Sequence, residues 1–178
     1  PASDLDRETL QARMPAGAAR NAVDCALWDF EAKRSGRRVA DLAGLASPQP
    51  ATTCFTISLG TPEEMAAKAR AASHRPLLKL KLGGAGDAER VAAVRAAVPS
   101  ARLVADANES WTIDAMPTLM AACRAAGLEL VEQPLPAGQD EALAGIERPV
   151  PLCADESVHT AGDLPRLAGE LSALEEAV

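Results

Sequence analysis

Hydrophobic residues in the first 50 positions recur at helical spacing. Across residues 15–34 apolar side chains fall at i, i+3 and i+4, and charged side chains occupy the rest of the helical wheel. This pattern predicts one amphipathic helix that ends near residue 35. Two prolines within residues 46–50 suit neither a helix nor a central strand, so they predict a connector. We expect residues 1–48 to be the end of one domain and residues 49–178 to belong to another.

After residue 50 the hydrophobic pattern alternates between short and long segments. Five short apolar runs predict strands at residues 52–58, 77–82, 102–106, 128–132 and 151–155. Longer, alanine-rich segments predict helices at about residues 62–74, 87–98, 114–126, 138–146 and 161–177. Strands that alternate with helices of this length form βαβ units, whose strands are parallel. The predicted fold class is therefore α/β.

The ends of the five predicted strands recur at regular intervals of 23 to 26 positions. The residues at those ends are Thr56, Lys81, Asp106, Glu132 and Asp155. A fixed interval indicates a repeated βα unit, which favours a parallel (β/α) barrel over a doubly wound sheet with less uniform connections. The doubly wound sheet remains an alternative. The chain has room for roughly five of the eight units that close such a barrel.

Two lysines stand on one face of the second predicted strand. Lys79 and Lys81 alternate with leucines, so both ammonium groups lie on one side and the leucines on the other. A buried parallel strand is normally apolar on both faces, so this pair is costly unless it faces a polar pocket at the strand ends. The alternative is an edge strand that lysines protect from aggregation. The glycine-rich run at 83–86 lacks phosphate-loop spacing and predicts a simple turn.

Three carboxylates end the next three predicted strands. Asp106, Glu132 and Asp155 each follow apolar residues and precede a loop. Three carboxylates on one rim repel one another unless a cation lies among them, and ligation by oxygen alone favours Mg²⁺ over Zn²⁺. Each acid taken singly could instead cap or begin a helix. In step with the lysines, the three predict a magnesium site.

The composition narrows the classes of partner and compartment. A net charge of -7 argues against nucleic acid or an anionic membrane as the main partner and favours a small-molecule substrate. Four cysteines without a C-x-x-C pair predict reduced thiols and neither a zinc site nor a disulfide framework. No leader-like start and no apolar run near ~20 residues is present, so we expect a cytoplasmic protein.

Four motifs at the strand ends together resemble the muconate-lactonizing subgroup of the enolase superfamily. They are Lys79-x-Lys81, Asp106-Ala-Asn108, Glu132-Gln133-Pro134 and Asp155-Glu156-Ser157. Within that subgroup, residues 19–33 and 52–69 look most like the dipeptide epimerases. The resemblance covers nearly the whole chain. It implies about five units of an enolase-superfamily (β/α) barrel, preceded by the last helices of an α+β capping domain.

The resemblance also implies an activity, which is Mg²⁺-dependent 1,1-proton transfer at the α-carbon of a dipeptide of the L-Ala-D/L-Glu type through an enediolate. It makes Lys81 the base and Lys79 its electrostatic neighbour. It implies the metal ligands Asp106, Glu132 and Asp155, and the flanking residues Thr56, Asn108, Gln133 and Glu156. A muconate cycloisomerase or an o-succinylbenzoate synthase shares these features and remains an alternative.

One element of the epimerase pattern is missing. That pattern includes a second lysine on the sixth barrel strand, whereas the last lysine here is Lys81 and the final residues predict a helix. We therefore expect about half of a family member, which alone could bind metal or exchange a proton on one face. A catalytically silent half-barrel is the alternative from another class. Exposed strand edges would make a homo-oligomer possible.

Overall fold

The computed structural model describes residues 6–167, and the chain divides into two units, Pro1–Ala51 and Thr52–Val178. From residue 6 onward, the first unit contains three helices: α1 (Arg7–Arg13), α2 (Ala18–Ser35) and α3 (Val39–Leu42). The amphipathic helix predicted over residues 15–34 is present as α2. It ends at Gly36, whose φ of 65° is left-handed and suits a residue without a side chain.

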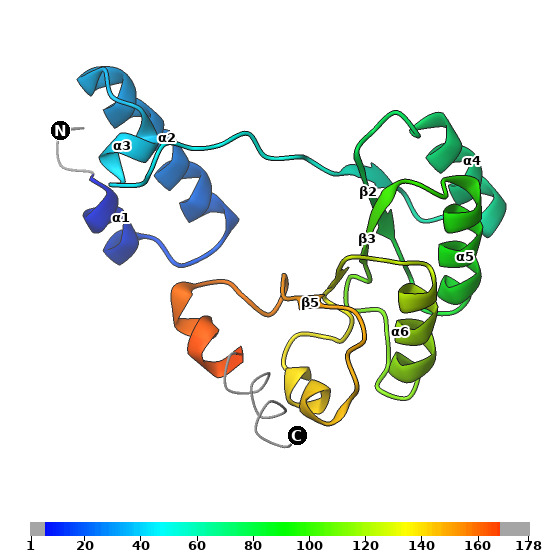
Figure 1. The fold of residues 1–178 in the computed structure, drawn as a ribbon. Helices are drawn as coiled ribbons and strands as arrows, with labels where there is room; N and C mark the ends of the chain where they lie inside the picture. The colour runs from blue at the N-terminus through cyan, green and yellow to red at the C-terminus, as the bar shows by residue number, and fades with distance from the viewer. Residues whose placement is uncertain (1–5, 168–178) are drawn as a thin grey trace. The chain divides into compact units, whose positions relative to one another are not determined.

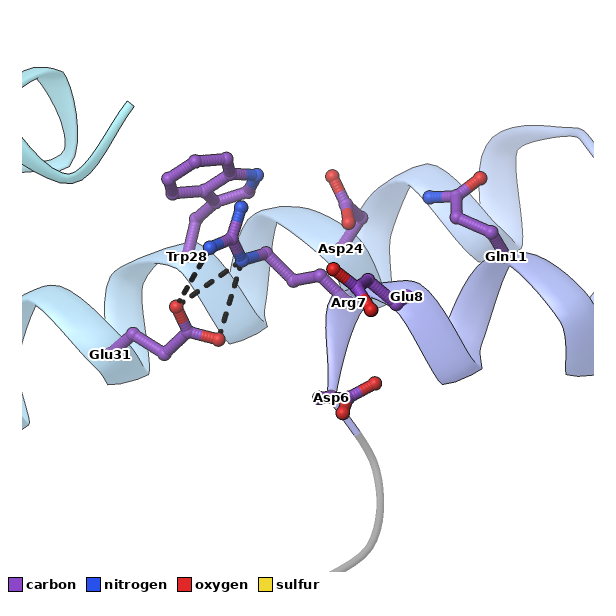
Figure 2. Close-up of a pocket in the computed structure, with 7 residues that line it drawn as sticks. All are labelled: Asp6, Arg7, Glu8, Gln11, Asp24, Trp28 and Glu31. Atoms are coloured by element: carbon purple, nitrogen blue, oxygen red, sulfur yellow. Dashed lines mark hydrogen bonds and ion pairs between the residues drawn. The ribbon is translucent and has the colours of Figure 1, made fainter. Parts of the chain in front are cut away.

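A groove of about 500 Å³ lies between α1 and α2 (Figure 2). The Arg7 guanidinium lies over the Trp28 ring, 3.4 Å from its centroid, and pairs with Glu31 at 3.1 Å. Figure 2 shows these three side chains gathered on one side of the groove. Arg7 thus links the two helices by stacking on one residue of α2 and by neutralising another.

The second unit is built on five parallel strands. They are β1 (Phe55–Ile57), β2 (Leu77–Lys81), β3 (Arg102–Asp106), β4 (Val131–Glu132) and β5 (Leu152–Cys153). Each strand pairs with the next in chain order. The helical segments between and after them are α4 (Pro62–Ala71), α5 (Asp87–Ala97), α6 (Met116–Ala125), η1 (Asp140–Gly145) and η2 (Ala161–Asp163). The prediction of an α/β fold with successive parallel strands is confirmed.

Alternation along β2 separates the core from the lysines. Leu78 and Leu80 are fully buried, whereas Lys79 and Lys81 on the opposite face are partly exposed. The buried leucines belong to one hydrophobic cluster that also includes Val91 of α5. Figure 1 shows α4, α5 and α6 along one side of β2 and β3. The helices therefore cover the leucine face and leave the lysine face for polar chemistry.

Two predicted helices differ in the structure. The segment predicted as a helix over residues 138–146 is the short 3₁₀ helix η1. Gly138 has a left-handed φ of 86° just before it and Gly145 ends it, so too few residues remain between them to propagate an α-helix. The helix predicted over 161–177 begins as the 3₁₀ turn η2 (Ala161–Asp163) and continues as α-helix over residues 164–167; its remainder lies outside the described residues.

The four cysteines are free thiols and differ in accessibility. Burial raises the pKa of the Cys123 thiol to about 12, whereas Cys25 and Cys54 are exposed. We expect iodoacetamide at pH 8 to label Cys25 and Cys54 in the native protein and to leave Cys123 unmodified, because the thiolate is the reacting form. Peptide mass mapping with and without denaturant measures this. Native labelling of Cys123 at the rate of Cys25 would contradict the core described above.

Within residues 6–167, every helix is too short or too polar to cross a bilayer.

Candidate active site

The register of the parallel strands brings lysines and carboxylates to one rim. Lys81 pairs in register with Asp106, and Asp106 pairs with Glu132, so the three strand ends are level. The Lys79 Nζ lies 2.8 Å from Asp106 Oδ2 and 2.7 Å from Glu132 Oε2. The Lys81 Nζ lies 2.6 Å from the same Asp106 oxygen. Both predicted lysines and two of the three predicted metal ligands therefore form one cluster.

The cluster is held together by opposite charges at low exposure. Burial lowers the pKa of Lys79, but the carboxylates of Asp106 and Glu132 outweigh that effect and raise the pKa above its ordinary value. Burial raises the pKa of Asp106, but the two lysines outweigh it and hold this pKa below its usual value. The two carboxylates therefore favour the charged form of Lys79.

The two lysines differ in how tightly they are held. Lys79 contacts two carboxylates, and its side chain is 18% exposed. Lys81 contacts one carboxylate and the Oδ1 of Asn108, at 2.7 Å, and its side chain is 35% exposed. Lys81 is therefore the more accessible of the two lysines, and Lys79 lies deeper, between the strand ends.

Asn108 connects three of the predicted site residues. Its backbone N–H donates to Asp106 Oδ1 at 3.0 Å, and its side-chain Nδ2 donates to Glu156 Oε1 at 3.2 Å. The other oxygen of Glu156, Oε2, is buried and has no hydrogen-bond partner in the part of the chain that the structure describes. A buried carboxylate oxygen without a donor costs free energy. It is thus an acceptor available to a ligand or a metal.

Backbone strain gathers beside the same strand ends. Among the described residues, three other than glycine have left-handed φ values, namely 42° at Asn108, 63° at Glu109 and 34° at Gln133. Such conformations cost on the order of 1–3 kcal/mol each and cluster at functional sites. The strain turns the chain sharply just beyond Asp106 and Glu132. It is a second indication, independent of the charges, that this rim is the functional surface.

Asp155 and Thr56 lie at the flanks of the cluster. Thr56 is exposed on β1 and pairs in register with Lys79. Asp155 is exposed in the turn after β5, and its backbone N–H donates to Gln133 Oε1 at 2.9 Å. Among residues 6–167, no group of three His, Cys, Asp or Glu is arranged to hold a metal ion. The structure brings Asp106 and Glu132 together, and the three-ligand set stays a prediction.

The donors that converge here suit a hard cation. Asp106 and Glu132 offer oxygen atoms only, and both already face a positive charge, the Lys79 ammonium. The partnerless oxygen of Glu156 belongs to a side chain that Asn108 joins to Asp106. Oxygen ligands of this kind fit Mg²⁺ better than Zn²⁺.

One residue that supports the site was missed by the sequence reasoning. Asp87, only 1% exposed, accepts hydrogen bonds from the backbone N–H groups of Gly83 and Gly84 and from Trp111 Nε1. It therefore fixes the turn that follows Lys81. The available signal was an aspartate directly after a glycine-rich run, at the first position of a predicted helix.

Parallel strands in chain order, with paired lysines and carboxylates at their carboxyl ends, define the class of (β/α)-barrel proteins that work at that rim. The family model described as "Enolase C-terminal domain-like" matches residues 63–173, and "Mandelate racemase / muconate lactonizing enzyme, N-terminal domain" matches residues 1–44. The chain therefore belongs to the enolase C-terminal domain-like family. The resemblance to the enolase superfamily is confirmed.

Two curated relatives are close in sequence. The L-Ala-D/L-Glu epimerase of Escherichia coli (strain K12) is 46% identical over 93% of this chain and 52% of its own length. The N-acetyl-D-glutamate racemase of Pseudoalteromonas sp. is 44% identical over 88% of this chain and 49% of its own. The chain thus spans about half the length of the curated relatives it matches.

Two solved structures share the fold. An enolase family member from Agrobacterium tumefaciens, described with bound sodium and L-Ala-L-Glu, superposes with a TM-score of 0.88 at 51% identity, over 95% of this chain and 52% of that one. A dipeptide epimerase from Methylococcus capsulatus, complexed with Mg and the dipeptide L-Arg-D-Lys, superposes with a TM-score of 0.82 at 32% identity. The match covers 91% of this chain and 48% of that one.

Proposed function

We propose that this chain contains the metal-binding half and one base of an Mg²⁺-dependent epimerase that acts at the α-carbon of a dipeptide of the L-Ala-D/L-Glu type. The observation that carries the proposal is the contact of both lysines with Asp106 at the ends of adjacent parallel strands. The similarity to an L-Ala-D/L-Glu epimerase supports the choice of substrate.

The side chains divide the work by position. Lys81 is the more exposed lysine, and its amine removes the α-proton, while Asp106 and Asn108 hold that amine at the rim. Lys79 remains charged between Asp106 and Glu132 and adds positive potential beneath the substrate. Thr56, on the neighbouring strand β1, borders the same rim and is placed to contact the substrate.

Asp106, Glu132 and Asp155 are the proposed metal ligands, and Gln133 and Glu156 flank them. When bound, Mg²⁺ supplies positive charge to the substrate carboxylate as negative charge develops at the α-carbon. The magnesium in the Methylococcus capsulatus structure supports this choice of ion. The other lysines, Lys33 and Lys68, lie on α2 and α4, so the chain is proposed to exchange the proton on one face of the substrate.

Isotope exchange tests the proposal. The purified chain is incubated in D₂O with L-Ala-L-Glu and Mg²⁺, and loss of the glutamate α-proton signal is followed by NMR. We expect deuterium uptake at that carbon with retention of configuration, and we expect EDTA to stop it. No uptake with Mg²⁺, or uptake unaffected by EDTA, would show that the proposed site does not perform this chemistry.

N-acetylglutamate is a second candidate substrate, because a relative of almost equal similarity is an N-acetyl-D-glutamate racemase. Both compounds are glutamates whose nitrogen is acylated, so the α-proton beside the carboxylate is chemically equivalent. Exchange rates measured in parallel on the two compounds decide between them. Faster exchange on N-acetylglutamate would move the assignment from a dipeptide to an acylated amino acid.

A further inference from the structure

The ladder between β4 and β5 ends just before the proposed ligand Asp155. Its last backbone bond runs from the Gln133 N–H to the Cys153 carbonyl at 2.8 Å. Beyond that point the Gln133 side chain takes over, because its Oε1 accepts from the backbone N–H groups of Asp155, at 2.9 Å, and Ser157, at 3.1 Å. A buried amide, 2% exposed, thus holds the segment that carries Asp155.

The orientation of that amide is fixed from its other end. Gln133 Nε2 donates to the Leu135 carbonyl and to Ser157 Oγ, both at 2.9 Å. The Ser157 hydroxyl in turn donates to Asp140 Oδ1 at 2.9 Å. Gln133, Ser157 and Asp140 are all at least 96% buried. The hydrogen bonds therefore form one continuous series through buried side chains, called the relay below.

The hydrogen bonds of this relay can run in only one direction. At one end, backbone N–H groups can only donate; at the other, a carboxylate can only accept. Each group between the two ends therefore accepts on one side and donates on the other. The backbone N–H groups donate to Gln133, Gln133 donates to Ser157, and Ser157 donates to Asp140. Asp140 is thus the acceptor at which the series ends, and it orients the Ser157 hydroxyl that holds Gln133 Nε2. Arg166 stands at its far side, with Nη1 3.4 Å from Asp140 Oδ2.

We propose that Asp140 is a positioning residue for Asp155, acting through Ser157 and Gln133. The inference rests on the proposed function, in which Asp155 is a metal ligand. In the part of the chain that the structure describes, the Asp155 carboxylate has no hydrogen bond or ion pair, so the anchoring of its backbone decides where the carboxylate lies. Asp140, on η1, reaches the rim without touching metal or substrate.

The test replaces Asp140 without changing its shape. Asp140→Asn keeps one acceptor oxygen and replaces the other by an NH₂ donor, so it cannot accept from both Ser157 and Arg166. We expect Mg²⁺ affinity, measured by titration calorimetry on the full chain, to fall about 10- to 100-fold, the usual cost of losing a partner that orients a metal ligand. The matched control is Glu141→Gln, which removes the same charge from an exposed neighbour on η1 and should leave the affinity unchanged.

Hydrogen exchange in the metal-free protein provides a readout that does not depend on metal binding. We expect Asp140→Asn to speed amide exchange in a peptide covering residues 153–158, with no change in β2 or in Glu141→Gln. If the wild-type chain takes up no Mg²⁺, the proposed function fails, and this exchange still tests the relay.

Ser157→Ala breaks the same relay while keeping Asp140 and Arg166 together, so it serves if Asp140→Asn does not fold. We expect it to give the same loss of Mg²⁺ affinity. An affinity within about twofold of the control in the folded variants, whatever their melting temperature, would overturn the inference. Unfolding of both variants would also overturn it, because the relay would then hold the fold and not the ligand.

Discussion

Replacing Lys81 with arginine is expected to stop α-proton exchange while the ion pair with Asp106 is retained. A guanidinium can contact the same carboxylate, but it stays protonated at any accessible pH and cannot act as a base. Loss of a positioned general base costs about 10²- to 10⁴-fold in rate. We therefore expect exchange of L-Ala-L-Glu in D₂O, followed by NMR, to fall by about that factor.

The Lys81→Arg variant keeps the positive charge at this position and removes only the ability to accept a proton. Mg²⁺ affinity should stay within about threefold of wild type, because Asp106 and Glu132 remain paired with Lys79. Lys68→Arg is the matched control, since Lys68 is an exposed lysine on α4 and the same substitution there should leave exchange unchanged. Exchange by Lys81→Arg within tenfold of wild type would remove Lys81 as the base and leave Lys79 as the alternative.

The arrangement of lysines and carboxylates at the rim was predictable from two sequence patterns, the interval between strand ends and the alternation of side chains along a strand. The regular interval between strand ends predicted a repeated βα unit, and the parallel pairing of successive strands agrees with it, with Lys81 opposite Asp106 and Asp106 opposite Glu132. The alternation of leucine and lysine predicted the two faces of β2. Such short-range patterns determine which side chains share a face, since side chains alternate along any strand.

The partners of each charge were not predictable in the same way. Lys79 contacts Glu132, 53 positions away, two strands along the sheet, and no local pattern encodes that distance. Gln133 was expected to flank the ligands, but its role depends on a left-handed turn that points the amide at the Asp155 N–H. Asp140 carried no signal at all, because its partner Ser157 lies on another segment.

The 3₁₀ character of η1 has the same origin. Residues 138–146 have helical composition, yet the segment must place Asp140 against Ser157 and Leu143 in the core within a few residues. Tertiary contacts of this kind override the weak preference of a six-residue segment for an α-helix. The polar relay and the short helix are thus one feature of the fold.

Removal of the Asp87 carboxylate is expected to have the largest effect on stability. Asp87→Ala removes the acceptor of Trp111 Nε1 and of two glycine N–H groups, and it breaks the ion pair with Arg90, which keeps two carbonyl acceptors. Trp111 is buried, with 2% of its surface exposed. Breaking a buried charged network costs about 3–5 kcal/mol, a large share of the roughly 5–15 kcal/mol that stabilises a domain. Urea unfolding measures this as a lower midpoint with an unchanged slope.

Two further variants show whether the carboxylate itself is responsible. Glu89→Ala removes an exposed acid from the same first turn of α5 and should cost under about 0.5 kcal/mol. Trp111→Phe removes one donor and leaves Asp87 its other partners, so it should cost about 1 kcal/mol. If Asp87→Ala lowers the free energy of unfolding no more than Trp111→Phe does, the turn at Gly83 and Gly84 does not depend on the Asp87 carboxylate. A larger cost would show that Asp87 fixes the turn beyond Lys81, and with it the place of the proposed base.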